Sequence, residues 1–228
     1  MNTNKEDTHI GKFKVIYRPD VPGDYTVIEE HCNHSSYSNK LNLKSTDRWL
    51  DLGSHIGCFA LDIARVVDYV HCIEAEYSNV KLSLRNISLN PYANVVIEHA
   101  AVVSEDYKDD TVTLYLTKKS HSNSLHPEMY NVVHGFIDTI QVPVVHVNKL
   151  IKEHNLNKIK LDIEGAEHNI VPLIDWSNID EFIMEVHTQI IDIDIDKLFN
   201  FLTTQGFLVT NTTNDVPAPN LLFYGIRR

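Results

Sequence analysis

Two acidic residues and a histidine, placed at the ends of two apolar segments, have the types and spacing of a proton-transfer site. Asp162 and Glu164 close the segment "KIKLDIE", and His187 closes "EFIMEVH". Both segments are typical of buried strands, and strand alternation turns Asp162 and Glu164 to the same side. Mutual repulsion raises the pKa of at least one of these carboxylates, which suits a general base acting on a hydroxyl. Positioning of a polar ligand and a structural turn are the alternatives, and a neutral His187 is a rival base.

A glycine turn, "LDLGSHIG", follows another buried strand and opens a helix. Gly53 permits a tight bend, Gly57 lets the new helix pack close to the strand, and free N–H groups at the helix start suit an anionic ligand group. The pattern lacks the middle and last glycines of G-x-G-x-x-G, which argues against a pyrophosphate ligand and a nicotinamide dehydrogenase. An ordinary strand-to-helix turn is the structural alternative. The candidate ligand-binding residues here are Asp51, Gly53, Ser54, His55 and Gly57, with His55 expected to hold the turn or contact a ligand carboxylate.

Glu74 ends the strand that follows this helix, about 20 positions beyond Gly53. In nucleoside-binding folds an acidic residue at this offset accepts hydrogen bonds from ribose hydroxyls. Glu74 and its neighbour Ala75 therefore complete the expected nucleoside site. A ligand with a ribose but no pyrophosphate fits this combination, and S-adenosylmethionine is such a ligand.

Alternating apolar and amphipathic segments must position these residues. Strands are predicted at 48–53, 69–75, 94–103, 111–117, 139–147, 158–164, 181–187, 207–212 and 221–227, and helices at 56–67, 78–90, 148–155, 166–174 and 194–206. Strands separated by helices form parallel pairs, whereas the last two strands have no helix between them and must pair antiparallel. The prediction is an α/β fold with a mainly parallel seven-stranded sheet, flanked by helices, whose last strand is antiparallel.

The motifs resemble those of the FkbM-type S-adenosylmethionine-dependent methyltransferases. "LDLGSHIGCF" is similar to that family's first motif, "CIEAEYSNVKLSLRNISLN" to its second strand and helix, and "KIKLDIEGAEHNIV" to its most characteristic segment, with "FIMEVH" as its next strand. The resemblance implies a class I methyltransferase (Rossmann-like) fold, S-adenosylmethionine as methyl donor, and O-methylation of sugars or hydroxylated small molecules. It also implies that Ala101 flanks the adenine and that Asp162 or Glu164 can hold the methionine ammonium. His55 departs from the family, which often has Asn there.

The domain organisation expected from these patterns has two parts. Residues 1–47 are an N-terminal extension in which segments 12–17 and 25–30 form a strand hairpin. Residues 48–228 are the S-adenosylmethionine-dependent methyltransferase domain. The polar loop 118–136 is a candidate lid on the acceptor side, with a surface insertion as the alternative.

Charge and composition restrict the partners. The net charge is −11, from 31 acidic against 20 basic residues, and no basic block is longer than two residues, which argues against nucleic-acid binding. The polar N-terminus, the lack of a long apolar stretch and the three cysteines without a C-x-x-C pair predict a cytoplasmic protein that does not enter a membrane. The oligomeric state is left open.

No metal requirement is expected, because the spacing of the histidines matches no compact metal site. If an ion is needed, Asp162 and Glu164 are the carboxylates to hold it. The expected acceptor is a small molecule or glycan. Methylation of nitrogen or of a peptide or RNA, and a catalytically inactive S-adenosylmethionine-binding module, are the alternative functions.

Overall fold

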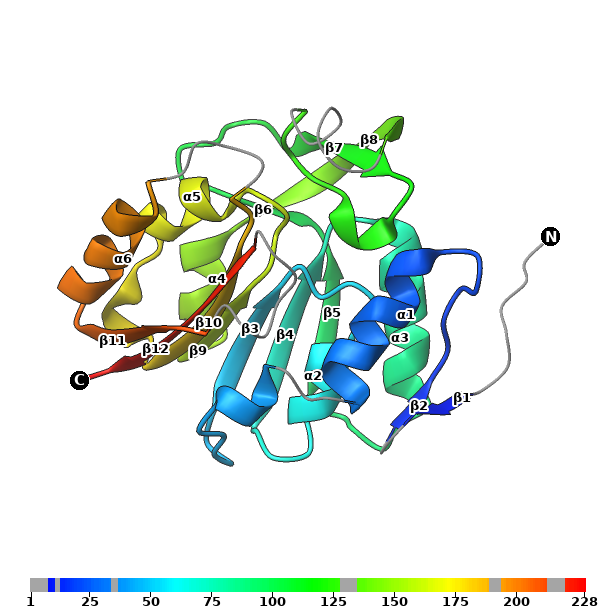
Figure 1. Cartoon of the computed structure of the whole chain (residues 1–228), viewed down its shortest axis with the longest axis horizontal. Helices are drawn as coiled ribbons and strands as arrows, with labels where there is room; N and C mark the ends of the chain where they lie inside the picture. The colour runs from blue at the N-terminus through cyan, green and yellow to red at the C-terminus, as the bar shows by residue number, and fades with distance from the viewer. Residues whose placement is uncertain (1–7, 11–12, 34–36, 128–134, 189–193, 213–219) are drawn as a thin grey trace.

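A computed structural model describes residues 8–10, 13–33, 37–127, 135–188, 194–212 and 220–228. Its main sheet has seven strands in the order β11-β12-β10-β9-β3-β4-β5 (Figure 1). These strands are β3 (Arg48–Leu52), β4 (Tyr69–Glu74), β5 (Val95–His99), β9 (Lys158–Leu161), β10 (Glu181–Val186), β11 (Phe207–Asn211) and β12 (Leu221–Arg227). β12 pairs antiparallel with both β10 and β11, and the other pairs are parallel. The predicted sheet with its antiparallel last strand is confirmed.

The helices that connect these strands cover both faces of the sheet. They are α2 (Cys58–Ile63), α3 (Tyr77–Ser88), α4 (Val147–Glu153), α5 (Glu167–Ile170) and α6 (Ile195–Thr204), with short 3-10 turns at Val171–Leu173 and Trp176–Asn178. One core joins the sheet to α4, α5 and α6, and a second joins its other face to α2. Parallel strands covered on both sides bury nearly every residue, as β3 and β10 do. The helix predicted at 78–90 begins one residue earlier, at Tyr77, with Glu76 as its N-cap.

A smaller sheet of β6 (Ala101–Val103), β7 (Thr111–Thr117) and β8 (Phe136–His146) lies above the main sheet in Figure 1. The single strand predicted over 94–103 is therefore two strands. The main-sheet ladder ends where the Ala100 N–H donates to the Glu74 carbonyl, and β6 then pairs parallel with β8. The apolar run has no Gly or Pro to mark this change of partner, so the break has no sequence signal.

The N-terminal segment contains a hairpin, but with other partners than predicted. β2 (Phe13–Val15) pairs with β1 (Thr8–Ile10), while 25–30 lies in helix α1 (Pro22–Ile28) and the following π-helical turn, Glu29–Asn33. A proline at the start and Asp24 in the first turn favour this helix. Side chains of β2 and α1 share a core with α2 and α3. The boundary between residues 47 and 48 stays a prediction.

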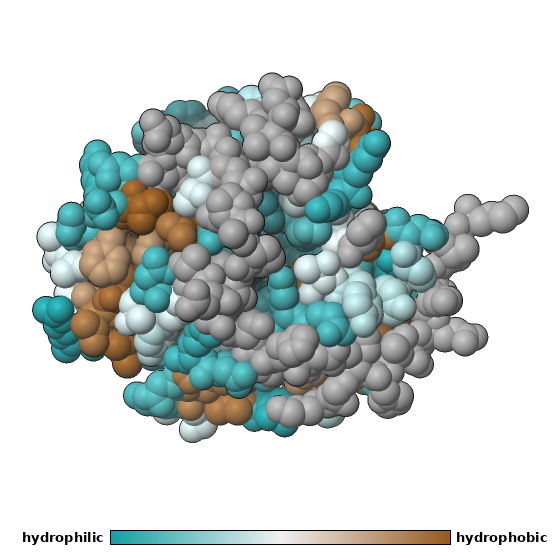
Figure 2. Space-filling model, in the orientation of Figure 1, coloured by the Kyte–Doolittle hydropathy of each residue, from teal (hydrophilic) through white to brown (hydrophobic). Residues whose placement is uncertain are grey.

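The surface has a hollow near the centre of the face drawn in Figure 2, lined by hydrophilic side chains, while apolar side chains gather at the left over α6. Among the helices that the structure describes, none combines the length and the apolar character that crossing a bilayer requires.

Candidate active site

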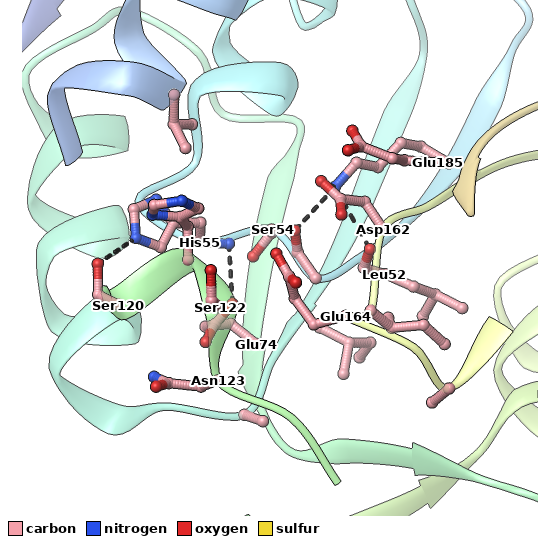
Figure 3. Close-up of a pocket in the computed structure, with 18 of the residues that line it drawn as sticks. Leu52, Ser54, His55, Glu74, Ser120, Ser122, Asn123, Asp162, Glu164 and Glu185 are labelled. Atoms are coloured by element: carbon pink, nitrogen blue, oxygen red, sulfur yellow. Dashed lines mark hydrogen bonds and ion pairs between the residues drawn. The ribbon is translucent and has the colours of Figure 1, made fainter. Parts of the chain in front are cut away.

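A cavity of about 530 Å³ lies beyond the carboxyl ends of β3, β4, β9 and β10. Its lining includes most of the residues predicted from sequence, namely Gly53, Ser54, His55, Glu74, Ala75, Ala101, Asp162, Glu164 and His187. Two predicted residues lie outside that lining: Asp51 is buried within β3, and Gly57 precedes α2. Figure 3 shows two groups: His55, Glu74, Ser120, Ser122 and Asn123 form a glycine-loop end, and Asp162, Glu164 and Glu185 form an acidic end, with Ser54 between.

Both glycines of the turn are required by close approaches. Gly53 has φ +75°, and a Cβ there would lie 1.8 Å from the carbonyl oxygen of Asp162. Gly57 has φ +86°, and its Cβ would lie 2.5 Å from the Ser83 hydroxyl of α3. Gly57 thus allows packing against the next helix, where the sequence suggested packing against the strand. Positive φ and lack of space together exclude any side chain at these positions.

Glu74 connects the glycine turn to the start of α3. Its carboxylate accepts hydrogen bonds from the backbone N–H of His55 and of Glu76, both at 2.8 Å, and from the Asn79 side chain at 3.2 Å. Burial raises its pKa to about 7, against the lowering effect of these hydrogen bonds. The sequence predicted this residue only from its offset to Gly53, and the structure places its carboxylate at the cavity wall.

His55 is locked by the N-terminal segment. Its Nε2 lies 2.8 Å from the Ser120 hydroxyl and 3.5 Å from Asp24, a fully buried carboxylate that also accepts hydrogen bonds from Arg18. Burial lowers the pKa of His55 to about 3, so the ring is neutral at physiological pH. Arg18 donates in turn to Asn79 at 2.6 Å. The residues before β3 therefore help to build the glycine-loop end.

Ala75 and Ala101 lie in one small apolar cluster with Leu114, Val142 and Leu125. Ala75, Ala101, Leu114 and Leu125 also line the cavity. A flat aromatic ring can bind to such a surface, since it removes apolar area from water. Ala75 follows β4, whereas Ala101, Leu114 and Leu125 come from β6, β7 and the loop after β7, so the small sheet supplies most of this wall.

A buried lysine separates the two ends. Lys160 on β9 lies 3.3 Å from Asp51 and 3.5 Å from Asp162, and it donates to the carbonyl of Gly53 at 2.8 Å. Burial lowers the lysine pKa, but the two carboxylates outweigh burial and raise it above its ordinary value. Asp51 is therefore the lysine's partner beneath the floor of the cavity. The sequence signal for Lys160 is a lysine within an apolar strand segment.

Asp162, Glu164 and His187 converge, although not by the alternation expected. β9 already ends at Leu161, and Glu164 has φ +52° in the turn that follows. His187 Nε2 lies 3.2 Å from Glu164 and 3.9 Å from Asp162. Burial raises the pKa of Glu164 well above its usual value, and the charge of Asp162 adds to this effect. Burial also opposes ionisation of Asp162, but Lys160 and His187 outweigh it and lower that pKa.

The carboxylates around His187 favour its protonated form. Burial lowers the pKa of the imidazole, but Glu164, Glu167 and Glu185 together raise it well above its ordinary value. Nδ1 lies 3.2 Å from Glu167, and Nε2 lies 3.7 Å from Glu185. The neutral imidazole expected of a rival base is therefore disfavoured in this structure.

The rim of the acidic end is formed by residues without a local sequence signal. Glu185 accepts a short hydrogen bond from the Tyr37 hydroxyl and another from Asn220 at 2.6 Å. Glu30 and His31 enter from the π-helical turn, and burial together with Glu185 and Asp162 raises the pKa of Glu30 to about 7. No spacing rule connects Glu30, His31 and Tyr37 to β10, because they lie more than a hundred positions before it in the chain.

The loop predicted as a lid contributes to the lining through Lys119–Asn123 and Leu125. Ser124 donates to the carbonyl of Glu164 at 2.5 Å and so holds the turn at the acidic end. Residues 128–134, which include Met129 and Tyr130, lie outside the described part of the chain.

Comparison with known proteins assigns the sequence to a family. A family model described as a methyltransferase FkbM domain matches residues 51–209. No curated protein matches the sequence. Among solved structures, a precorrin-6y C5,15-methyltransferase from Geobacter metallireducens GS-15 superposes with a TM-score of 0.54 at 10% identity over 95% of each chain.

Two further structures have the same fold. The methyltransferase FkbM from Methylobacillus flagellatus KT has a TM-score of 0.54 at 15% identity, with 82% of this chain and 45% of that chain covered. Trm5b from Pyrococcus abyssi has a TM-score of 0.54 at 11% identity, covering 99% and 56%. These identities establish the fold alone, which is that of class I methyltransferases. Because the family model covers more than half of the sequence, the chain belongs to the methyltransferase FkbM family and is an S-adenosylmethionine-dependent methyltransferase by family and fold.

Proposed function

We propose that this protein transfers the methyl group of S-adenosylmethionine to a hydroxyl oxygen of a sugar, glycan or other small hydroxylated molecule. The observation that carries the proposal is the continuity of one cavity from Glu74 and the glycine turn to the acidic end. A donor bound at the first end directs its sulfonium toward carboxylates, which favour a positive charge. The acceptor then occupies the space beside Asp162 and Glu164.

Different residues contact different parts of the donor in this proposal. Glu74 accepts from the ribose, Ala75 and Ala101 contact the adenine, and the turn with Ser54 and His55 contacts the methionine part. Asp162, whose pKa is low, positions the methionine ammonium or the acceptor hydroxyl as an ionised carboxylate. Gly53 and Gly57 serve through the backbone shape that they allow.

Glu164 is the proposed general base. The acceptor oxygen attacks the methyl carbon, the carbon–sulfur bond breaks with its electrons going to sulfur, and the hydroxyl proton passes to the Glu164 carboxylate. A raised pKa makes Glu164 a stronger base than Asp162 once it is ionised. Protonated His187 keeps the carboxylate in place and stabilises its charge. Alignment of the acceptor oxygen with the methyl group supplies most of the remaining acceleration.

The first experiment is calorimetric titration with S-adenosylmethionine and S-adenosylhomocysteine, followed by an acceptor panel read by release of S-adenosylhomocysteine. Micromolar donor binding with turnover on hydroxylated acceptors supports the proposal. Turnover confined to amines, peptides or RNA would overturn the O-methylation part. The acidic composition, with net charge −11, favours a small neutral acceptor over RNA.

A further inference from the structure

We propose that the acidic end is a binding site for one divalent cation, held by Asp162, Glu164 and His187. One ligand atom from each of these side chains lies within 4.8 Å of the other two. A divalent ion with bonds of about 2.1 Å places neighbouring ligand atoms about 3.0–3.5 Å apart. The Glu164–His187 separation of 3.2 Å already meets this spacing, and the Asp162–His187 separation of 3.9 Å needs only a small side-chain movement.

The surroundings of His187 are those of a metal ligand. Its Nε2 faces Glu164 and Asp162, so an ion bound there would replace the proton that Nε2 carries without a metal. Its Nδ1 lies 3.2 Å from Glu167, which is fully buried. A histidine that binds a metal through one nitrogen usually donates its other N–H to a carboxylate, which fixes the ring and its tautomer. Glu167 is itself held by the backbone N–H groups of Ile163 and Gly165, so this orienting group is rigid.

A second, separate observation is an unsatisfied imidazole in the same cavity. His31 lines the same cavity, is only 4% exposed, and its Nδ1 has no hydrogen-bond partner within the described residues. It comes from the N-terminal segment and lies within electrostatic range of Asp162. A buried imidazole nitrogen without a partner costs free energy unless a ligand or water satisfies it.

The acidic groups that line the cavity also favour a bound cation. Five carboxylates line it among the described residues, against two lysines: Glu30, Glu74, Asp162, Glu164 and Glu185, with Lys119 and Lys160. Lys160 is already shared between Asp51 and Asp162. Two carboxylate oxygens and one imidazole nitrogen suit a first-row divalent ion such as Mn²⁺. An ion here would bind the acceptor oxygen and lower its pKa, while the second oxygen of Glu164 takes the proton.

The role of the ion in catalysis rests on the proposed function, but ion binding can be measured without donor or acceptor. The purified full chain is freed of metal with a chelator and titrated with Co²⁺, followed by its visible d–d absorption and, with Mn²⁺, by electron paramagnetic resonance. We expect one equivalent to bind. Glu164→Gln and His187→Gln should abolish saturable binding, and Glu167→Gln should weaken it about 10- to 100-fold through the orientation of His187.

The control is Glu98→Gln, which changes a carboxylate that pairs with a histidine elsewhere, His71 at 2.9 Å, without a third ligand. It should bind Co²⁺ as the unchanged protein does. S-adenosylhomocysteine binding verifies that each variant is folded. Protein that binds S-adenosylhomocysteine but gives no Co²⁺ spectrum overturns the inference and leaves the methyltransferase proposal standing. Equal Co²⁺ binding by the unchanged protein, Glu164→Gln and His187→Gln overturns it as well.

Discussion

The two ends of the cavity are built in different ways. The glycine-loop end is formed largely by two consecutive strand-to-helix connections. Its key carboxylate, Glu74, accepts hydrogen bonds from backbone N–H groups of both connections. The acidic end gathers carboxylates from β9, β10 and the N-terminal segment around Lys160 and His187. The first end depends on hydrogen bonds and backbone shape, and the second on a balance of buried charges.

This difference predicts how substitutions at each end change donor binding, catalysis and stability. The backbone N–H groups and the shape of the turn stay in place when one side chain changes, so donor binding at the glycine-loop end should weaken only partly. Buried charges that compensate one another leave an unpaired charge when one is removed, which costs far more. We therefore expect the two ends to be separable by mutation, with catalysis and stability concentrated at the acidic end.

The largest expected effect is on methyl transfer in Glu164→Gln. Removal of the proposed base should lower kcat about 10²- to 10⁴-fold, because general-base catalysis contributes a factor of that size. The dissociation constant of S-adenosylhomocysteine should stay within about twofold, since the glycine-loop end is unchanged. Single-turnover kinetics on the best acceptor of the panel, together with calorimetry, measure both quantities. A parallel loss of donor binding would show that the two ends are not separable.

The next effect is on stability in Lys160→Met. The substitution leaves the fully buried Asp51 without its cation and removes one of the two cations beside Asp162, which should lower the free energy of unfolding by about 3–5 kcal/mol. The matched control is Lys149→Met, which removes an exposed lysine 3.9 Å from Glu153 and should change stability by less than about 0.5 kcal/mol. Urea unfolding followed by circular dichroism gives both values. Equal stability of the two variants would contradict the charge-balance description of the acidic end.

The sequence predicted the glycine-loop end better for the same physical reason. Its elements follow one another in the chain, so Gly53 and Glu74 are related by a fixed strand–helix–strand length. The acidic end was found only where it lies directly after β9 and β10. Glu30, His31 and Tyr37 reach it through tertiary packing of the N-terminal segment. Part of that segment, "YTVIEE", has the composition of a strand but folds as a helix.

The fold was predictable to a similar extent. Apolar segments marked all seven strands of the main sheet, and the central strands β3, β4, β9 and β10, which are covered on both faces, bury nearly every residue. The division at Ala100 was missed, since no Gly or Pro stands where the chain exchanges β4 for β8 as its partner. The convergence of Asp162 with Glu164 was predicted for the wrong local reason: a left-handed turn, and not strand alternation, brings them together.

A smaller effect is expected on donor affinity in Glu74→Ala. Loss of a charged hydrogen-bond acceptor for the ribose should weaken S-adenosylmethionine binding about 10- to 100-fold. The acidic end should be unaffected, so Co²⁺ binding, if present in the unchanged protein, should persist. Calorimetric titration of both ligands tests this. Unchanged affinity would show that Glu74 only supports the turn through the N–H groups of His55 and Glu76.

The smallest expected effect is the pH dependence of donor binding. Burial raises the pKa of Glu74 to about 7, and only the ionised carboxylate accepts the ribose hydroxyl while keeping its N–H bonds. The donor therefore binds the ionised form and releases a proton, so affinity is full above this pKa and falls as pH drops through it. The dissociation constant should be about tenfold larger at pH 6 than at pH 8. Glu74→Gln, which cannot ionise, should give a flat profile over this range. A slope that persists in Glu74→Gln would assign the titration to the acidic end, where Glu30 has a similar pKa of about 7.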